Sequence, residues 1–367
     1  MPSAIPALPT QHTAIVAEGR GKLRVRHDSR VPALGRGVAM VKTAAVAINP
    51  VDAKMVDYSP VPGAITGYDF AGTIVALGED TPSHLGVGDR VAGFVHGMNK
   101  ALPDVGAFAE YVAAPANLLL RIPPEMRLEE AATLGLGLFT AGLGLFRELQ
   151  VPASLDATKA NSKSDNSSTG EFVLVAGGST ATGTRAIQLL KLTGLRPIAT
   201  CSKNNFDLVC RFGAEKAFDY SNPECAAEIR AYTRNTLAYA LDCIAAVETT
   251  QLCYDSIGRA GGRYATVEPF RDSATSQRPL TIIPSWLLAV TIFGRKVDLD
   301  GEYARDISVE DQAFAVDFTV QVQALLDDGK LDTHPVKIMP GSWDAVIEGV
   351  DLIRHQALSG QKLVYPV

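Results

Sequence analysis

The first third of the chain carries short apolar or alternating runs separated by glycine, proline and aspartate. This spacing is typical of β-strands joined by turns. It predicts strands at residues 13–17, 38–47, 73–77 and 90–94, and a further strand that begins in 106–112. Around residues 128–149 the pattern becomes helical, because Glu129 and Glu130 open an alanine- and leucine-rich segment interrupted by glycines.

From residue 171 onward, apolar strands alternate with helices. The predicted strands are residues 172–176, 197–200, 216–219, 239–243, 262–267 and 290–294, with a helix over about 182–194 after the first. Continuous apolar strands that alternate with helices predict a parallel, doubly wound sheet. Nearer the C-terminus we expect amphipathic helices at 310–326 and 342–355 and a final strand at 362–367.

Residues 153–170 are polar and have almost no large apolar side chains. Such a segment cannot bury enough surface to offset the entropy of ordering it, so we expect a mobile surface loop. At 367 residues the chain is longer than one hydrophobic core usually supports. Two domains are therefore expected, and the loop immediately precedes the second group of strands.

The composition, with 47% hydrophobic and 20% charged residues, is typical of a soluble globular enzyme. The net charge of −6 gives no reason to expect nucleic acid or an anionic membrane as a partner. No apolar run approaches the roughly 20 residues that span a bilayer. Residues 1–6 lack the basic start and apolar region of a signal peptide, so we expect a cytoplasmic protein.

The metal-ligating residue types form no recognisable site. None of the five cysteines stands in a Cys-x-x-Cys pair, which favours buried thiols over a zinc site or a redox dithiol. The six histidines form no spaced cluster either. We therefore expect no metal.

The turn at residues 175–183 lies between a predicted strand and a predicted helix, which is the context of a dinucleotide-binding fingerprint. Glycine there lets the backbone approach a pyrophosphate, which then sits at the helix N-terminus. The predicted cofactor-binding residues are Gly178, Ser179, Thr180, Ala181 and Thr182. The alternative is a tight strand-to-helix turn that binds no ligand.

The end of the second strand of this sheet indicates which nicotinamide cofactor is bound. An NAD site usually has an acid there for the ribose 2′-hydroxyl, but this chain has no acid in residues 200–205. Lys203 and nearby polar groups would instead attract a 2′-phosphate, which favours NADPH. The predicted contacts are Ser202, Lys203, Asn204, Asn205 and, from the next strand end, Tyr220. Alternatively, Lys203 is only a solvated loop charge.

Five segments together resemble the medium-chain dehydrogenase/reductase superfamily, and the similarity runs nearly end to end. They are Ala47-Ile48-Asn49-Pro50-Val51-Asp52, Gly67-Tyr68-Asp69-Phe70-Ala71-Gly72, residues 86–91, residues 106–111 and residues 358–363. Tyr68 stands where zinc-dependent members have a ligating histidine, and Asn-Pro-x-Asp is similar to the zinc-free quinone and enoyl reductase branch.

The resemblance implies an α/β protein of two domains. A GroES-like, β-rich catalytic domain would comprise residues 1–145 and 295–367 and hold the substrate. A Rossmann domain with a doubly wound parallel sheet would comprise residues 146–294 and bind NADPH. Quinone reductases of this class are usually dimers, whereas the branch described next tends to be monomeric, which favours a monomer here.

Further stretches, at 46–55, 177–182, 199–202, 205–208 and 291–294, resemble the trans-acting enoyl reductases of fungal polyketide biosynthesis. The family implies a substrate that is an α,β-unsaturated polyketide thioester. The thioester would be held on the acyl carrier domain of a partner highly reducing polyketide synthase or synthase–peptide synthetase hybrid. Two alternatives stay open: a stand-alone quinone or alkenal reductase, and a non-catalytic NADPH-binding sensor or scaffold.

The resemblance also implies roles for particular residues. The turn residues Pro50, Val51, Asp52, Ala53 and Lys54 would line the nicotinamide, and Ser359 and Gly360 would contribute to cofactor binding. Lys54, Tyr58 and Thr140 are the catalytic candidates, although each could be an ordinary surface or packing residue. The substrate would contact Gly137, Leu138, Phe139, Thr140, Ala141, Gly142, Ala289, Val290, Thr291 and Ile292. Tyr68 would either face the substrate or fill the space that zinc left.

Overall fold

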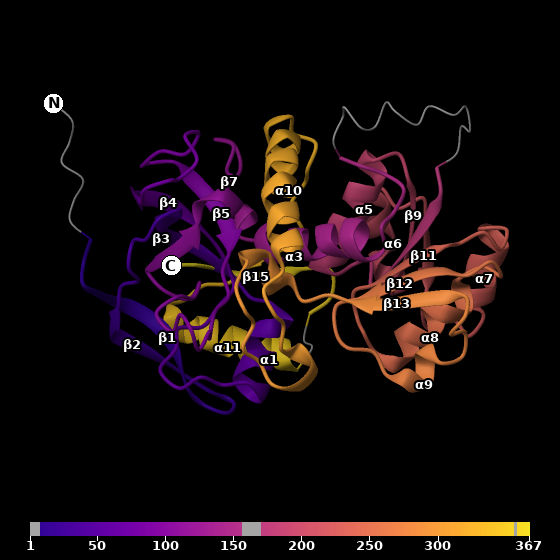
Figure 1. The fold of residues 1–367 in the computed structure, drawn as a ribbon, viewed down its shortest axis with the longest axis horizontal. Helices are drawn as coiled ribbons and strands as arrows, with labels where there is room; N and C mark the ends of the chain where they lie inside the picture. The colour runs from indigo at the N-terminus through magenta and orange to yellow at the C-terminus, as the bar shows by residue number, and fades with distance from the viewer. Residues whose placement is uncertain (1–7, 156–169, 356–357) are drawn as a thin grey trace. The chain divides into compact units, whose positions relative to one another are not determined.

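The computed structural model describes residues 8–155, 170–355 and 358–367 (Figure 1). The chain divides into two compact units, residues 1–136 with 290–367 and residues 137–289. The polar segment expected to be a mobile loop lies largely outside the described residues. In the part of the chain that is described, no helix has the length and apolar character to cross a membrane.

The first unit is built on an antiparallel hairpin and a mostly antiparallel mixed sheet. Strands β1 (Gln11–Gly19) and β2 (Lys22–Arg30) form a hairpin. A second sheet has the order β14-β15-β3-β4-β5-β7, and β6 also pairs with β3. Its strands are β3 (Val38–Ala47), β4 (Asp69–Leu77), β5 (Arg90–Phe94), β6 (Tyr111–Pro115), β7 (Leu120–Arg121), β14 (Val336–Ile338) and β15 (Lys362–Pro366). Because β15 pairs antiparallel with β3, both ends of the chain contribute to one sheet.

Helices of different lengths complete this unit. They are α1 (Pro50–Tyr58), η1 (Ala116–Leu118), α2 (Leu128–Ala131), η6 (Gly301–Tyr303), α10 (Val309–Asp327) and α11 (Trp343–Arg354). The core includes Ile48, Phe70, Phe108 and Tyr365, which are all almost completely buried. Burying such side chains is the main favourable contribution to folding, at roughly 1.5–3 kcal/mol each.

The second unit contains a six-stranded, fully parallel sheet of order β10-β9-β8-β11-β12-β13. The strands are β8 (Phe172–Ala176), β9 (Arg196–Cys201), β10 (Lys216–Asp219), β11 (Tyr239–Asp242), β12 (Gly262–Thr266) and β13 (Ile282–Trp286). The helices are α5 (Ala181–Leu192), η4 (Lys203–Asn205), α6 (Phe206–Arg211), α7 (Cys225–Tyr232), α8 (Val247–Ser256) and α9 (Asp272–Thr275). The order reverses between β8 and β11, which is where doubly wound sheets bind ligands. The predicted α/β fold is confirmed.

Two expectations, on the strand at 290–294 and on Cys210, were wrong. The strand expected at 290–294 does not form, because this stretch lies mostly in the 3₁₀-helix η5 (Ala289–Phe293), and the sixth parallel strand is β13. The glycine-interrupted helical segment expected at 128–149 is confirmed, as α2, α3 (Gly135–Gly142) and a π-helical turn η2 (Leu143–Glu148). Cys201, Cys225 and Cys253 are buried as expected and Cys243 is half-buried, but Cys210 is exposed.

Candidate active site

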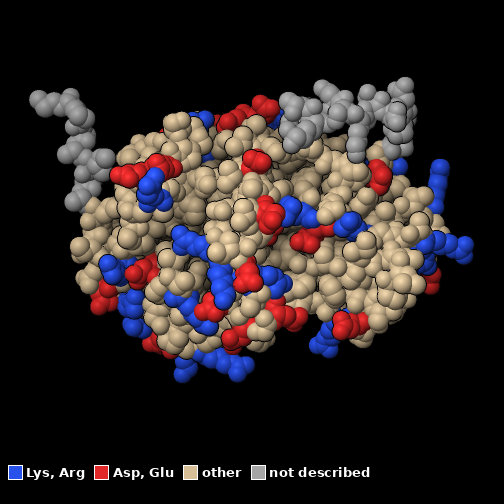
Figure 2. Space-filling model, viewed as in Figure 1, with Lys and Arg blue, Asp and Glu red and all other residues tan. Residues whose placement is uncertain are grey.

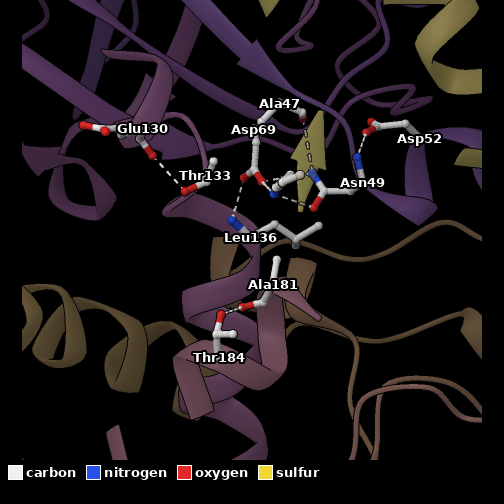
Figure 3. A network of polar contacts seen from close by, with 10 residues as sticks. Ala47, Asn49, Asp52, Asp69, Glu130, Thr133, Leu136, Ala181 and Thr184 are labelled. Carbon is white, nitrogen blue, oxygen red and sulfur yellow. Dashed lines mark hydrogen bonds and ion pairs between the residues drawn. The ribbon is translucent and has the colours of Figure 1, made fainter. Parts of the chain in front are cut away.

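A buried polar network lies where three strands of the first unit meet, next to the Asn-Pro-x-Asp turn (Figure 3). Asn49 follows β3, Asp69 begins β4 and Lys362 begins β15. The side-chain amide of Asn49 donates to Asp69 Oδ2 over 2.9 Å, and Lys362 Nζ donates to Asn49 Oδ1 over 2.8 Å. Lys362 also forms an ion pair with Asp69, whose other oxygen accepts from the Leu136 N–H over 2.6 Å. The network ties three distant parts of the sequence together.

Asp52 fixes the turn itself. Its Oδ2 accepts from the backbone N–H of Asn49 over 2.7 Å, so Asn49 and Asp52 define the start of α1. Burial raises the pKa of the Asp52 carboxyl to about 8, and the nearby Asp69 adds to this rise. These contacts indicate that Asp52 positions the turn rather than taking part in chemistry.

The two catalytic candidates on α1 share its exposed face. Lys54 and Tyr58 are four residues apart, which places them on one side of a helix. Lys54 is exposed and Tyr58 is 74% exposed, whereas Ala53, Met55 and Val56 are buried. Pro50 is exposed and Val51 half-buried at the start of the same helix. Lys54 and Tyr58 therefore give α1 an exposed face that carries an ammonium group and a phenol.

Tyr68 lies in the position that the family resemblance gives to a zinc ligand. It is 3% exposed, and its ring centroid is 6.0 Å from that of His96. Burial, helped by the carboxyl of Asp52, raises the pKa of Tyr68, so its hydroxyl stays protonated. Burial also lowers the pKa of His96 to about 4. His96, which follows β5, was given no role in the sequence analysis because the six histidines form no cluster along the chain.

No group of three or more His, Cys, Asp or Glu residues is placed to hold a metal ion within the described ranges.

In the second unit, the glycine-bearing turn between β8 and α5 has the geometry that a pyrophosphate needs. Gly177 has a φ of 74°, and Thr180 caps α5 by accepting from the Gly183 N–H over 2.9 Å. A Cβ on Gly183 would lie 2.4 Å from the carbonyl oxygen of Gly177, so only glycine fits. The N–H groups of Ala181 and Thr182, the first two of the helix, are not used by intrahelical bonds. This cradle fits a nicotinamide dinucleotide.

The end of β9 carries the residues predicted to choose between the two nicotinamide cofactors. Ser202, Lys203, Asn204 and Asn205 form a short turn that includes η4, in which the amide of Asn205 donates to Ser202 Oγ over 3.0 Å. Tyr220, at the end of the neighbouring β10, is 56% exposed.

The structure adds an acid that the sequence reasoning did not consider. The ammonium group of Lys203 lies 3.6 Å from Asp219 Oδ2, at the end of β10. Hydrogen bonds from Ser221 hold the pKa of Asp219 below its usual range, so this carboxylate is charged. Lys203 is thus partly compensated rather than a lone cation.

The remaining predicted site residues have been placed but not assigned a role by the structure. In α3, Gly137, Leu138, Phe139, Thr140, Ala141 and Gly142 are all buried. In η5, Ala289, Val290 and Ile292 are buried, and the hydroxyl of Thr291 donates to Asp311 Oδ2 over 2.6 Å. Ser359 is exposed, and Gly360 has a φ of 66°.

Comparison with known proteins agrees with this architecture. Residues 35–124 match the alcohol dehydrogenase GroES-like domain, and residues 181–295 match the zinc-binding dehydrogenase domain. Among solved structures, the CurK enoyl reductase superimposes with a TM-score of 0.73 at 18% identity, covering 96% of this chain and 98% of that one. A quinone oxidoreductase of Pseudomonas syringae pv. Tomato DC3000 gives a TM-score of 0.70 at 18% identity, with 97% and 99% covered. These likenesses define a fold of the medium-chain dehydrogenase/reductase class.

Relatives that match over their full length identify the family within this superfamily. The chain is 70% identical over 367 residues to the trans-enoyl reductase traG of Penicillium crustosum, covering all of both proteins. It is 69% identical over 368 residues to the trans-enoyl reductase caaB of Aspergillus niger, again with 100% of each chain covered. The protein therefore belongs to the trans-enoyl reductases, oxidoreductases of the medium-chain superfamily that act on a carbon–carbon double bond.

Proposed function

We propose that the protein uses NADPH to reduce an α,β-unsaturated polyketide thioester on the acyl carrier domain of a partner polyketide synthase or synthase–peptide synthetase hybrid. The observation that carries this proposal is the 70% identity, over the whole chain, to a trans-enoyl reductase. The dinucleotide cradle at residues 177–183 supports it from the structure.

The reaction needs little from the protein beyond positioning and charge stabilisation. NADPH supplies a hydride to the β-carbon of the enoyl group, which is already electrophilic. The electron pair of the double bond then moves to the thioester oxygen as an enolate, and a proton added at the α-carbon completes the saturated thioester. The site must hold the reactants in line and donate hydrogen bonds to that oxygen.

We assign these tasks first to the residues of α1 and α3. Lys54, on the exposed face of α1, would donate to a cofactor ribose or to the enolate, and Tyr58 on the same face is a second donor. Thr140 would contact substrate or nicotinamide from α3. Residues 137–142 and 289–292 would line the acyl chain, and the protein would act as a monomer, which size-exclusion chromatography with light scattering can test.

Lys203 provides a test of the cofactor assignment. We expect Lys203→Ala to weaken NADPH binding about tenfold, because a charge-assisted contact to the 2′-phosphate is lost. NADH, which has no such phosphate, should bind almost as before. Asp219→Asn should strengthen NADPH binding, since it removes the negative charge beside Lys203. Fluorescence titration of both cofactors measures this, and equal losses for NADPH and NADH would contradict the assignment.

The activity itself is tested by NADPH oxidation with a crotonyl thioester of pantetheine, the same thioester on a carrier domain, and a small quinone. We expect turnover of the thioesters and preference for the carrier-bound form. Turnover of the quinone alone would indicate a stand-alone quinone reductase. Cofactor binding without oxidation by any substrate would indicate a sensor or scaffold.

A further inference from the structure

The loop that follows β5 holds His96 tightly against the segment that contains Tyr68. The N–H of Val95 donates to the Tyr68 carbonyl oxygen over 3.0 Å, and the N–H of Met98 donates to that of Ile65 over 2.7 Å. A Cβ on Gly97 would lie 2.2 Å from the carbonyl oxygen of Gly67, so the two backbones are in direct contact. The two rings are thus held side by side by backbone contacts.

The loop is also strained. Met98 is buried and has a φ of 58°, in the left-handed region that costs energy for a residue with a side chain. Backbone strain of this kind persists where the surrounding contacts hold it, and such positions are concentrated at functional sites. The strain at Met98, in the loop that packs against the segment containing Tyr68, therefore indicates a functional role for this loop.

Hydrogen bonds determine which nitrogen of His96 carries its proton. The Ala101 N–H donates to Asn99 Oδ1 over 2.9 Å, which turns the amide nitrogen of Asn99 toward His96. That nitrogen lies 3.3 Å from His96 Nδ1, and because an amide nitrogen can only donate, Nδ1 accepts. The neutral imidazole consequently carries its hydrogen on Nε2.

This Nε2–H has no acceptor in the part of the chain that the structure describes, although it is enclosed by protein. The hydroxyl of Tyr68 likewise has no hydrogen-bond partner among the described residues. Buried donors without acceptors are rare because leaving them unpaired is unfavourable. His96 Nε2–H is a donor of this kind, and the Tyr68 hydroxyl beside it also lacks a protein acceptor among the described residues, so the two groups form a place suited to an oxygen acceptor.

We propose that His96 Nε2–H and the Tyr68 hydroxyl form a donor pair that binds the carbonyl oxygen of the enoyl thioester. The assignment rests on the proposed function, because that reaction is what places a carbonyl oxygen at the site. The oxygen gains negative charge as the hydride reaches the β-carbon, so both hydrogen bonds strengthen in the transition state.

The donor pair does not supply the proton that the α-carbon receives. With a pKa of about 4, His96 is neutral near pH 7, and the raised pKa of Tyr68 makes its hydroxyl a poor acid. Both groups donate hydrogen bonds without giving up a proton. The α-carbon proton therefore comes from another group or from solvent.

The test compares Tyr68→Phe and His96→Phe with a matched pair in the same unit. His12 and Tyr111 also have ring centroids 6.0 Å apart, and His12 is buried. They lie away from the donor pair, because Tyr111 pairs with Lys42 on β3, five residues before the Ala47 that pairs with Asp69. We expect each site variant to lower kcat about a hundredfold with thioester substrates, the effect typical of losing one oxyanion donor. His12→Phe and Tyr111→Phe should change kcat by no more than about twofold.

A second readout is independent of turnover. The infrared stretch of a ¹³C-labelled thioester carbonyl should move to lower frequency when the substrate binds the wild-type protein, and should return toward its solution value in both site variants. NADPH binding and thermal unfolding identify any variant that has lost its fold, and Tyr68→Phe, which deletes a single oxygen atom, is the conservative case.

Retention of kcat within about twofold by both site variants, with an unchanged carbonyl frequency, would overturn the donor pair. An effect of only one substitution would also contradict it, since both groups are required. A wild-type protein that binds thioesters with the shifted carbonyl but never oxidises NADPH would instead contradict the proposed function and leave the donor pair standing.

Discussion

At the scale of single residues, the molecule buries an ion pair directly beside Tyr68 in the sequence. Asp69 is fully buried and Lys362 is 4% exposed, so their ion pair is shielded from water. Asn49 contacts both partners. A buried ion pair stabilises the folded state little more than apolar side chains of the same size would, but removing one partner leaves a buried charge without its counter-ion. The network therefore holds β3, β4 and β15 in one arrangement.

We expect Lys362→Met to lower the free energy of unfolding by about 3–5 kcal/mol, because Asp69 is left buried without its counter-ion. The matched control is Lys330→Met, which breaks the exposed pair with Asp328 and should cost about 0–1 kcal/mol. The double variant Asp69→Asn with Lys362→Met should recover part of the loss, since neither charge remains. Urea unfolding measures all three, and equal losses at Lys362 and Lys330 would contradict this account.

Asp52 gives the stability a definite dependence on pH. Its pKa is about 8 in the folded protein against 3.8 for the unperturbed group, so the folded state keeps a proton that the unfolded state has released. The contribution of Asp52 is fully present below pH 3.8 and is lost as the pH rises toward 8. We expect the stability of wild type relative to Asp52→Asn to fall steadily between these values, as measured by urea unfolding. A constant difference would show that Asp52 is ionised throughout.

At the scale of elements, the turn between β8 and α5 depends on close backbone packing. We expect Gly183→Ala to abolish NADPH binding, because its Cβ would meet the backbone of Gly177 and Gly178 at 2.4 and 2.8 Å. Gly35→Ala is the control, since its nearest neighbour is a Val38 methyl group 3.9 Å away. Fluorescence titration and thermal unfolding measure both variants, and normal NADPH affinity in Gly183→Ala would refute the cradle.

Elements with a strong local pattern could be predicted from the sequence. Strands β3, β5, β8 and β10 have the predicted bounds, because each is a compact apolar run between turn residues. Strand β2 was missed since its residues are largely charged, and β13 since it is half-exposed and contains a proline. The segment 128–149 breaks where Gly135 packs against Asp69 and Gly93, a tertiary contact that no local pattern reveals.

The same limit applies to the site. The dinucleotide turn and the Asn-Pro-x-Asp turn could be recognised because each is a continuous stretch. Lys362, Asp219 and His96 enter through strand pairing across long sequence separations. The residues that contact these side chains could be identified only once the strands had been placed. The two turns were therefore predictable from the sequence, but the side chains around them were not.

At the scale of the whole molecule, the chain combines a parallel dinucleotide-binding sheet with a mixed sheet to which both chain ends contribute. Charged side chains of both signs are scattered over the face seen in Figure 2, without a field of one sign that would indicate nucleic acid. With full-length relatives that are trans-enoyl reductases, this architecture supports hydride transfer to an activated alkene.

The most direct test of that claim follows the hydride itself. NADPH carrying deuterium at the transferred position of nicotinamide C4 is incubated with the protein and a carrier-bound crotonyl thioester, and the product is analysed by mass spectrometry and NMR. The account predicts one deuterium, located on the β-carbon, with a hydrogen from solvent on the α-carbon. Deuterium on the α-carbon, or a saturated product without deuterium, would contradict it.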